Sequence, residues 1–215
     1  MSAIATTATR AKRIFLLSPA NCGGVRAGQL VNPNATFELA TRLREPEGAP
    51  LGDVFAFISG LYFRGKLAYA RAFAPASAFV ITPSRGLLPI DQPITREVLD
   101  EFACCDIDAD NATYRRPLER DVRLLASATL RAAPNDFVLL GSIASDKYVD
   151  VLLSHFGDRL YFPETFVGRG DMSRGGLMLR AASAGQELTY TRIAGATRHG
   201  PRPPKLEKLR APLTR

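Results

Sequence analysis

Short apolar runs alternate along the chain with longer segments that have helical spacing. The runs cover residues 14–17, 55–58, 79–82 and 137–140, and serine, proline or glycine directly follows each of them. Such runs are typical of strands that are buried on both faces of a parallel sheet. We therefore predict four buried strands, each of which ends at a turn.

The segments between these runs predict helices over residues 34–43, 66–73, 118–130 and 145–155. Residues 118–130 place apolar side chains on one face at steps of three and four, which is the pattern of an amphipathic helix that covers a core. Because strands and helices alternate, the predicted fold class is α/β. We expect a single domain with a mostly parallel or mixed sheet and helices on both of its faces.

A chain of 215 residues with 46% hydrophobic content can bury a sizeable core within one domain. We divide it into a basic N-terminal tail of residues 1–13, an α/β domain of residues 14–191 and a basic, proline-containing tail of residues 192–215. The formal net charge is +7, and most of the excess lies in these tails. Basic tails can hold nucleic acid weakly or merely keep a protein solvated, so the charge leaves both interpretations open.

The composition also argues against several classes of protein. No stretch approaches the roughly 20 apolar residues of a membrane span, and no apolar run that suits a secretory signal follows the first charges, so we expect a cytoplasmic protein without a membrane partner. Cys104 and Cys105 are adjacent, which favours reduced thiols over a disulfide framework. The two histidines lie far from the cysteines, so we expect neither a metal nor another cofactor. Cys22 is either an oxidation sensor or an inert buried thiol.

Four polar or glycine-bearing motifs directly follow the predicted strands, at residues 18–26, 59–66, 82–91 and 141–148. In an open α/β sheet, ligands collect beyond the carboxyl ends of the strands, because loops and helix N-termini converge there. Each motif could equally be a plain connection, but their coincidence predicts one composite site. The candidate residues for binding phosphate or nucleic acid in these motifs are Ser18, Asn21, Tyr62, Arg64, Lys66, Arg85, Ser145 and Tyr148.

A glycine- and arginine-rich segment at residues 168–176 has the most unusual composition in the chain. It holds four glycines in nine residues, together with Arg169, Asp171, Ser173 and Arg174. Glycine loses much conformational entropy on folding, while arginine offers charge-assisted hydrogen bonds to phosphate. The segment predicts an ordered loop that clamps a phosphate or a base, and a flexible linker is the alternative interpretation.

The order of these motifs resembles that of the YaaA family of bacterial peroxide-stress proteins. The matching elements are the tetrapeptide 17–20 with Asn21 where the family has lysine, a loosened aromatic and glycine element at residues 55–67, a proline-containing element at residues 83–91, the pentapeptide 144–148, and residues 173–178. The resemblance implies a YaaA-like mixed α/β fold with a basic cleft. It also implies DNA binding and a role in limiting oxidative DNA damage.

Three hypotheses for the function follow. The first is a DNA-binding protein whose arginines and Lys66 contact phosphates while Tyr62 or Tyr148 stacks on a base. The second is an enzyme that acts on a nucleobase or nucleotide, for example at the glycosidic bond, with Asp91, Asp146 or Asp171 as the acid, base or electrostatic group. The third is a non-catalytic interaction protein whose tails recruit a partner. No spacing of paired carboxylates and no nucleophile motif in the sequence selects the enzyme.

Overall fold

The computed structural model describes residues 12–130, 135–144 and 146–206, and within these residues the chain forms a mixed six-stranded sheet. The strand order is β4-β3-β1-β6-β7-β8. The inner strands β3 (Ala78–Ile81), β1 (Arg13–Leu17), β6 (Asp136–Leu140) and β7 (Leu160–Pro163) are parallel. The edge strands β4 (Leu87–Pro89) and β8 (Tyr190–Arg192) are antiparallel to their neighbours. This arrangement confirms the predicted α/β class with a mostly parallel sheet.

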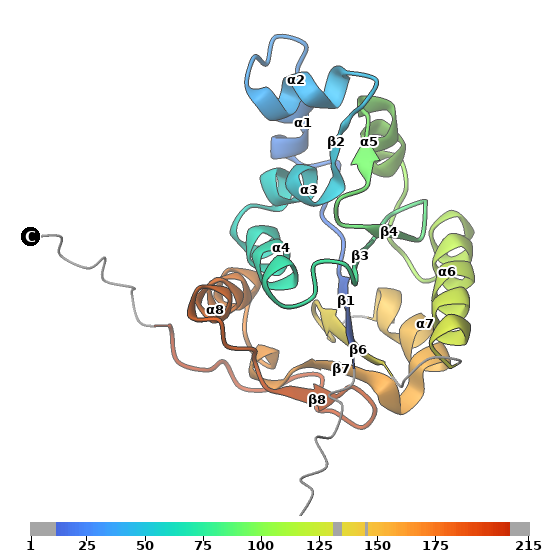
Figure 1. Ribbon diagram of the computed structural model, residues 1–215, viewed down its shortest axis with the longest axis vertical. Coiled ribbons are helices and arrows are strands. Elements are labelled where there is room, and N and C mark those ends of the chain that lie inside the picture. Colours follow the sequence, from blue (N-terminus) through green and yellow to red (C-terminus); the bar gives the residue numbers. More distant parts are fainter. Residues whose placement is uncertain (1–11, 131–134, 145, 207–215) are drawn as a thin grey trace, which may run out of the picture.

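Helices cover the sheet on both sides, as Figure 1 shows. On one side lie α4 (Leu61–Phe73) and α8 (Asp171–Ala184), and on the other lie α6 (Ala112–Leu130) and α7 (Asp146–Phe156). A smaller group of elements rises beyond the carboxyl end of β1 (Figure 1). It consists of α1 (Val25–Val31), α2 (Glu38–Arg44), α3 (Leu51–Ser59), α5 (Arg96–Ala103) and the two-stranded sheet of β2 (Ala49–Pro50) and β5 (Pro93–Ile94).

Three of the four predicted strands are confirmed as β1, β3 and β6, and their inward side chains are buried. The predicted strand at residues 55–58 is wrong, because this run belongs to helix α3. Leu51, Val54, Phe55 and Ile58 are all buried, which is the spacing of one helix face. A short apolar run does not by itself distinguish a buried strand from a turn of buried helix.

The predicted helices all occur, with shifted boundaries. Residues 34–43 contribute to the shorter α2, residues 66–73 lie within α4, residues 118–130 lie within α6, and residues 146–155 lie within α7. Two short 3₁₀ turns, Gly157–Arg159 and Glu164–Phe166, flank β7. In the part of the chain that the structure describes, no helix has the length and apolar character that a membrane crossing requires.

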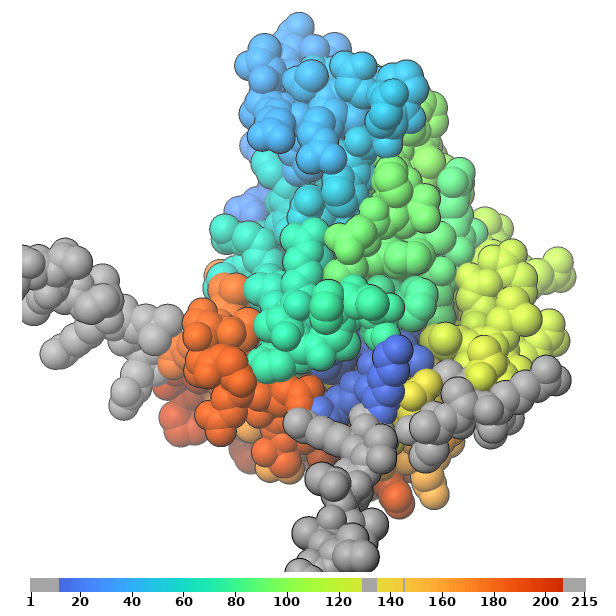
Figure 2. Space-filling model, in the orientation of Figure 1, coloured from blue at the N-terminus to red at the C-terminus, as the bar shows by residue number. Residues whose placement is uncertain are grey.

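The predicted loop at residues 168–176 is wrong for most of its length, because helix α8 begins at Asp171. One of its glycines, Gly175, serves the packing of α8 against α4. A Cβ atom on Gly175 would lie 2.6 Å from the carbonyl oxygen of Leu61, and one on Gly65 would lie 2.5 Å from the carbonyl oxygen of Gly175. These distances are too short for any side chain, so glycine at both positions lets the two backbones touch. Figure 2 shows the surface of α8, in orange, directly against that of α4.

Candidate functional site

A cleft of about 950 Å³ opens beyond the carboxyl ends of β1 and β6. The chain passes from β1 to β3 on one side, whereas β6 pairs with the other side of β1 and β7 lies beyond it. The strand order therefore reverses at the β1–β6 pair, and α/β folds bind ligands at such a point. The residues that line the cleft include Ser18, Asn21, Cys22, Ser59, Tyr62, Phe102, Cys105, Asp106, Asp108, Ser142, Lys147, Tyr148 and Asp171.

Ser18, the first residue after β1, forms the centre of the site together with Lys66 of helix α4. The Lys66 ammonium donates hydrogen bonds to Ser18 Oγ at 2.7 Å and to the Ser18 carbonyl oxygen at 3.0 Å. A Cβ atom on Gly141, at the end of β6, would lie 3.0 Å from Ser18 Oγ. Glycine at the end of the neighbouring strand thus leaves room for the serine side chain.

Lys66 is 1% exposed and lies inside an almost closed aromatic environment. Its Nζ atom lies 3.9 Å from the centre of the Tyr62 ring and 5.2 Å from that of Phe63. Burial lowers the pKa of Lys66 to about 7; the Asp171 carboxylate opposes this shift and the charge of Arg174 adds to it. Desolvation disfavours the charged form of a lysine, so this amine can exchange a proton near neutral pH.

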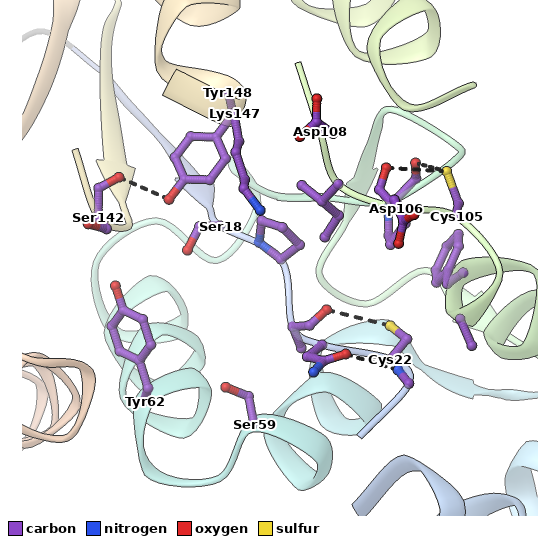
Figure 3. Close-up of a pocket in the computed structure, with 18 of the residues that line it drawn as sticks. Ser18, Cys22, Ser59, Tyr62, Cys105, Asp106, Asp108, Ser142, Lys147 and Tyr148 are labelled. Carbon is purple, nitrogen blue, oxygen red and sulfur yellow. Dashed lines mark hydrogen bonds between the residues drawn. The ribbon is translucent and has the colours of Figure 1, made fainter. Parts of the chain in front are cut away.

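Two tyrosines of the cleft present hydroxyl groups near Ser18. Tyr148, on the first turn of α7, donates a hydrogen bond of 2.9 Å to the Ser142 carbonyl oxygen. Burial raises the pKa of Tyr148, while its interaction with the Ser18 side chain acts in the opposite direction. Tyr62 is 7% exposed, and its hydroxyl makes no hydrogen bond of regular geometry with the described residues. Burial raises the pKa of this hydroxyl, and the Arg174 side chain beside it acts in the opposite direction. Figure 3 shows this hydroxyl pointing toward the space between Ser18 and Ser142.

The first turn of α8 completes the wall beside Tyr62. Arg174 is 9% exposed and donates hydrogen bonds to the Phe166 carbonyl oxygen at 3.2 Å and to Asp171 Oδ1 at 3.3 Å. The guanidinium thus fixes the turn that precedes the helix and holds the Asp171 carboxylate at the cleft. Arg174 therefore stabilises the local structure through its buried hydrogen bonds. Its positive charge also acts to lower the pKa values of Tyr62 and Lys66.

The opposite wall comes from the connection between α5 and α6, which the sequence did not mark. It brings Cys105, Asp106 and Asp108 to the cleft (Figure 3), next to Phe102 at the end of α5. The Cys105 thiol donates a hydrogen bond of 2.9 Å to the Pro83 carbonyl oxygen. The cluster of acids at residues 106–110 is the feature of the sequence that could have marked this connection as part of the site. Its position at the cleft depends on contacts with the end of β3, which is distant in the sequence.

The structure brings together about half of the predicted site residues. Ser18, Asn21, Tyr62, Tyr148 and Asp171 line the cleft. Lys66 lies directly behind Ser18, and Arg174 adjoins the cleft through Asp171. Ser145 lies outside the described residues.

The remaining predicted residues lie elsewhere, which corrects the expectation of one site that includes them all. Asp91 forms an ion pair with Arg71 at 3.1 Å on the outer side of α4, and Asp146 pairs with Arg198. Arg85 is bound by Glu101, and Arg64 lines a separate groove on the outside of α3 and α4.

Arg169 likewise turns away from the cleft, because it donates hydrogen bonds to the carbonyl oxygens of Thr165 and Pro204 and to the Ser173 hydroxyl. It thereby ties the end of the described chain to the start of α8. Within the described residues, no group of three or more histidine, cysteine, aspartate or glutamate side chains could hold a metal ion.

Comparison of the chain with models of protein families, with curated proteins and with solved structures finds no match. The resemblance to the YaaA family therefore stays a prediction. The fold and the site define the chain as an α/β protein whose cleft, at the reversal point of the strand order, is built over a buried serine–lysine pair.

Proposed function

We propose that the chain is an enzyme in which Ser18 is the nucleophile and Lys66 is its general base. The observation that carries this proposal is the 2.7 Å hydrogen bond between the Lys66 amine and Ser18 Oγ inside a buried environment. A serine hydroxyl is a weak nucleophile until a neighbouring base removes its proton. A nucleophile in hydrogen-bond contact with its base is the arrangement that this chemistry requires.

The environment of Lys66 supports the role of base. An ordinary lysine is protonated at neutral pH and cannot accept a proton, whereas burial brings the pKa of Lys66 to about 7. A substantial fraction of the amine is then neutral at physiological pH. General bases work best when their pKa lies near the operating pH.

The proposed reaction is transfer of an acyl-type group. The Ser18 Oγ proton passes to the neutral Lys66 amine while Oγ bonds to the carbonyl carbon of the substrate, and the carbonyl oxygen becomes an oxyanion. Collapse of this intermediate breaks the bond to the leaving group, which takes the proton from Lys66. Attack by water on the resulting ester, with Lys66 again as base, releases the acid and restores Ser18.

The charges of the cleft favour a small polar substrate over the backbone of a duplex. Asp106, Asp108 and Asp171 outnumber Lys147 among the charged residues that line it, and carboxylates repel phosphodiesters. Lys66 is covered by Ser18 and the aromatic rings, so its charge is not on the surface. A nucleotide-type substrate stays a prediction from the sequence. DNA binding also stays a prediction from the sequence.

A fluorophosphonate probe tests the proposal, because it forms a covalent bond with an activated serine. We expect labelling of wild-type protein at Ser18, located by peptide mass spectrometry, with a rate that rises with pH through a midpoint near that of Lys66. Ser18→Ala abolishes the label, and Lys66→Met slows it by roughly 10²–10⁴-fold. Ser59→Ala makes the same chemical change in the same cleft and serves as the control. Folded wild-type protein that stays unlabelled, or a label on another residue, refutes the proposal.

A further inference from the structure

Two tyrosine hydroxyls in the described chain are buried without a hydrogen-bond partner, those of Tyr62 and Tyr114. Burying an unpaired hydroxyl costs free energy, so such a group needs an explanation. Tyr114 lies on α6 and is fully buried outside the cleft. Tyr62 differs from it in position, because it lines the cleft and its hydroxyl points toward the space between Ser18 and Ser142 (Figure 3).

The position of Tyr62 is fixed from two sides. It lies in the first turn of helix α4, which follows Gly60, a residue with a positive φ of 64° that glycine adopts readily. The close contact of α4 with α8 at Leu61 and Gly175 holds the first turn of the helix in place. The Lys66 amine lies against one face of the ring. The hydroxyl is therefore preorganised and cannot turn away to find a partner in solvent.

Building on the proposed function, we infer that the Tyr62 hydroxyl is a catalytic residue: it donates a hydrogen bond to the substrate oxygen that becomes the oxyanion when Ser18 attacks. A donor that is already oriented and desolvated stabilises a developing negative charge far better than water does. Burial raises the pKa of the Tyr62 hydroxyl, and the nearby positive charge of Arg174 opposes this shift, which makes the hydroxyl a better donor than burial alone would. The substrate class is accordingly a compound whose reacting carbonyl group presents its oxygen to Tyr62 as a hydrogen-bond acceptor.

The inference explains why the protein keeps a buried hydroxyl that makes no hydrogen bond of regular geometry within the described residues. In the free protein the group costs stability, and in the complex it gains a partner. Functional residues are often suboptimal for stability in this way. Phenylalanine would preserve the ring and its contact with the Lys66 amine while it removes only the hydroxyl.

Tyr62→Phe and the matched control Tyr114→Phe test the inference, with the fluorophosphonate probe and urea unfolding as the two measurements. We expect both variants to unfold at urea concentrations at least as high as the wild type, because each loses an unpaired buried hydroxyl. Tyr62→Phe should lower the plateau rate of Ser18 labelling by about 10²-fold, the usual effect of removing one such donor. Its pH midpoint should stay unchanged, and Tyr114→Phe should label at the wild-type rate.

Each other outcome overturns the inference. A Tyr62→Phe protein that labels as fast as the wild type shows that the hydroxyl is not used, while the role of Ser18 and Lys66 stands. A shifted pH midpoint with an unchanged plateau assigns Tyr62 to positioning of Lys66 instead. A lower unfolding midpoint for Tyr62→Phe shows that the hydroxyl has a structural role. If wild-type protein is not labelled at Ser18, the proposed function and this inference fall together.

Discussion

Replacement of Lys66 by methionine removes the titrating amine while it keeps a flexible, largely apolar side chain of similar length in the same buried position. The unfolded chain holds the lysine proton up to the ordinary lysine pKa of 10.5, whereas the folded protein releases it near a pKa of about 7. Between these values the unfolded state binds more protons than the folded state. The free energy of unfolding of the wild type therefore rises with pH in this window.

The magnitude follows from the two pKa values of Lys66, 10.5 in the unfolded chain and about 7 in the folded protein. Linkage gives a rise in the free energy of unfolding of about 2 kcal/mol from about pH 6.5 to about pH 8.5, relative to a variant without the amine. Other groups titrate in both proteins and cancel in the difference. These include Cys22, whose pKa burial raises to about 12.

Urea unfolding followed by far-ultraviolet circular dichroism at several pH values measures this difference. The wild type should gain stability over Lys66→Met as the pH rises, whereas Lys147→Met, on an exposed residue of the same cleft, should parallel the wild type. If the curves of wild type and Lys66→Met run parallel, Lys66 keeps its proton throughout this range. Lys66 could then not act as the general base for Ser18.

Two further predictions concern packing and thiol chemistry. Gly175→Ala should lower the free energy of unfolding by about 3 kcal/mol in urea titrations, because its Cβ would lie 2.6 Å from the Leu61 carbonyl oxygen and force α4 and α8 apart. Gly28→Ala, which has open space around the added Cβ, should cost nothing and exclude a general effect of alanine. In native protein, iodoacetamide should modify the exposed Cys104 well before the buried Cys22, whose raised pKa leaves little thiolate; peptide mass spectrometry that finds Cys22 modified first would contradict this.

The sheet core could be predicted because its signal is local. An apolar run such as residues 14–17, stopped at once by Ser18 and Pro19, fits a buried strand that ends at a turn. The carboxyl end of that strand then marks the place where polar residues meet, and both Ser18 and Tyr148 lie in the cleft as expected. The run at residues 55–58 looked the same locally and formed a helix, because its neighbours Leu51 and Val54 complete a helical face.

The segment at residues 168–176 shows where composition misleads. Glycine and arginine favour a loop locally, but Gly175 is required by the backbone of α4, and Arg174 is buried by the turn at Phe166. The backbone of α4 is distant in the sequence, and the turn at Phe166 lies 8 residues before Arg174. The segment remains important for the site, because it holds Asp171 at the cleft and sets the charge around Tyr62.

The sequence by itself determined the α/β class, the central strands and the end of the sheet at which the candidate site lies, because hydrophobic periodicity and turn residues act over a few positions. Only the tertiary structure decided which polar residues meet and which are buried. Lys66 and Ser18 are 48 residues apart and come into contact because α4 packs across the end of β1. The same packing removes water from the amine and lowers its pKa, and no local pattern encodes that environment.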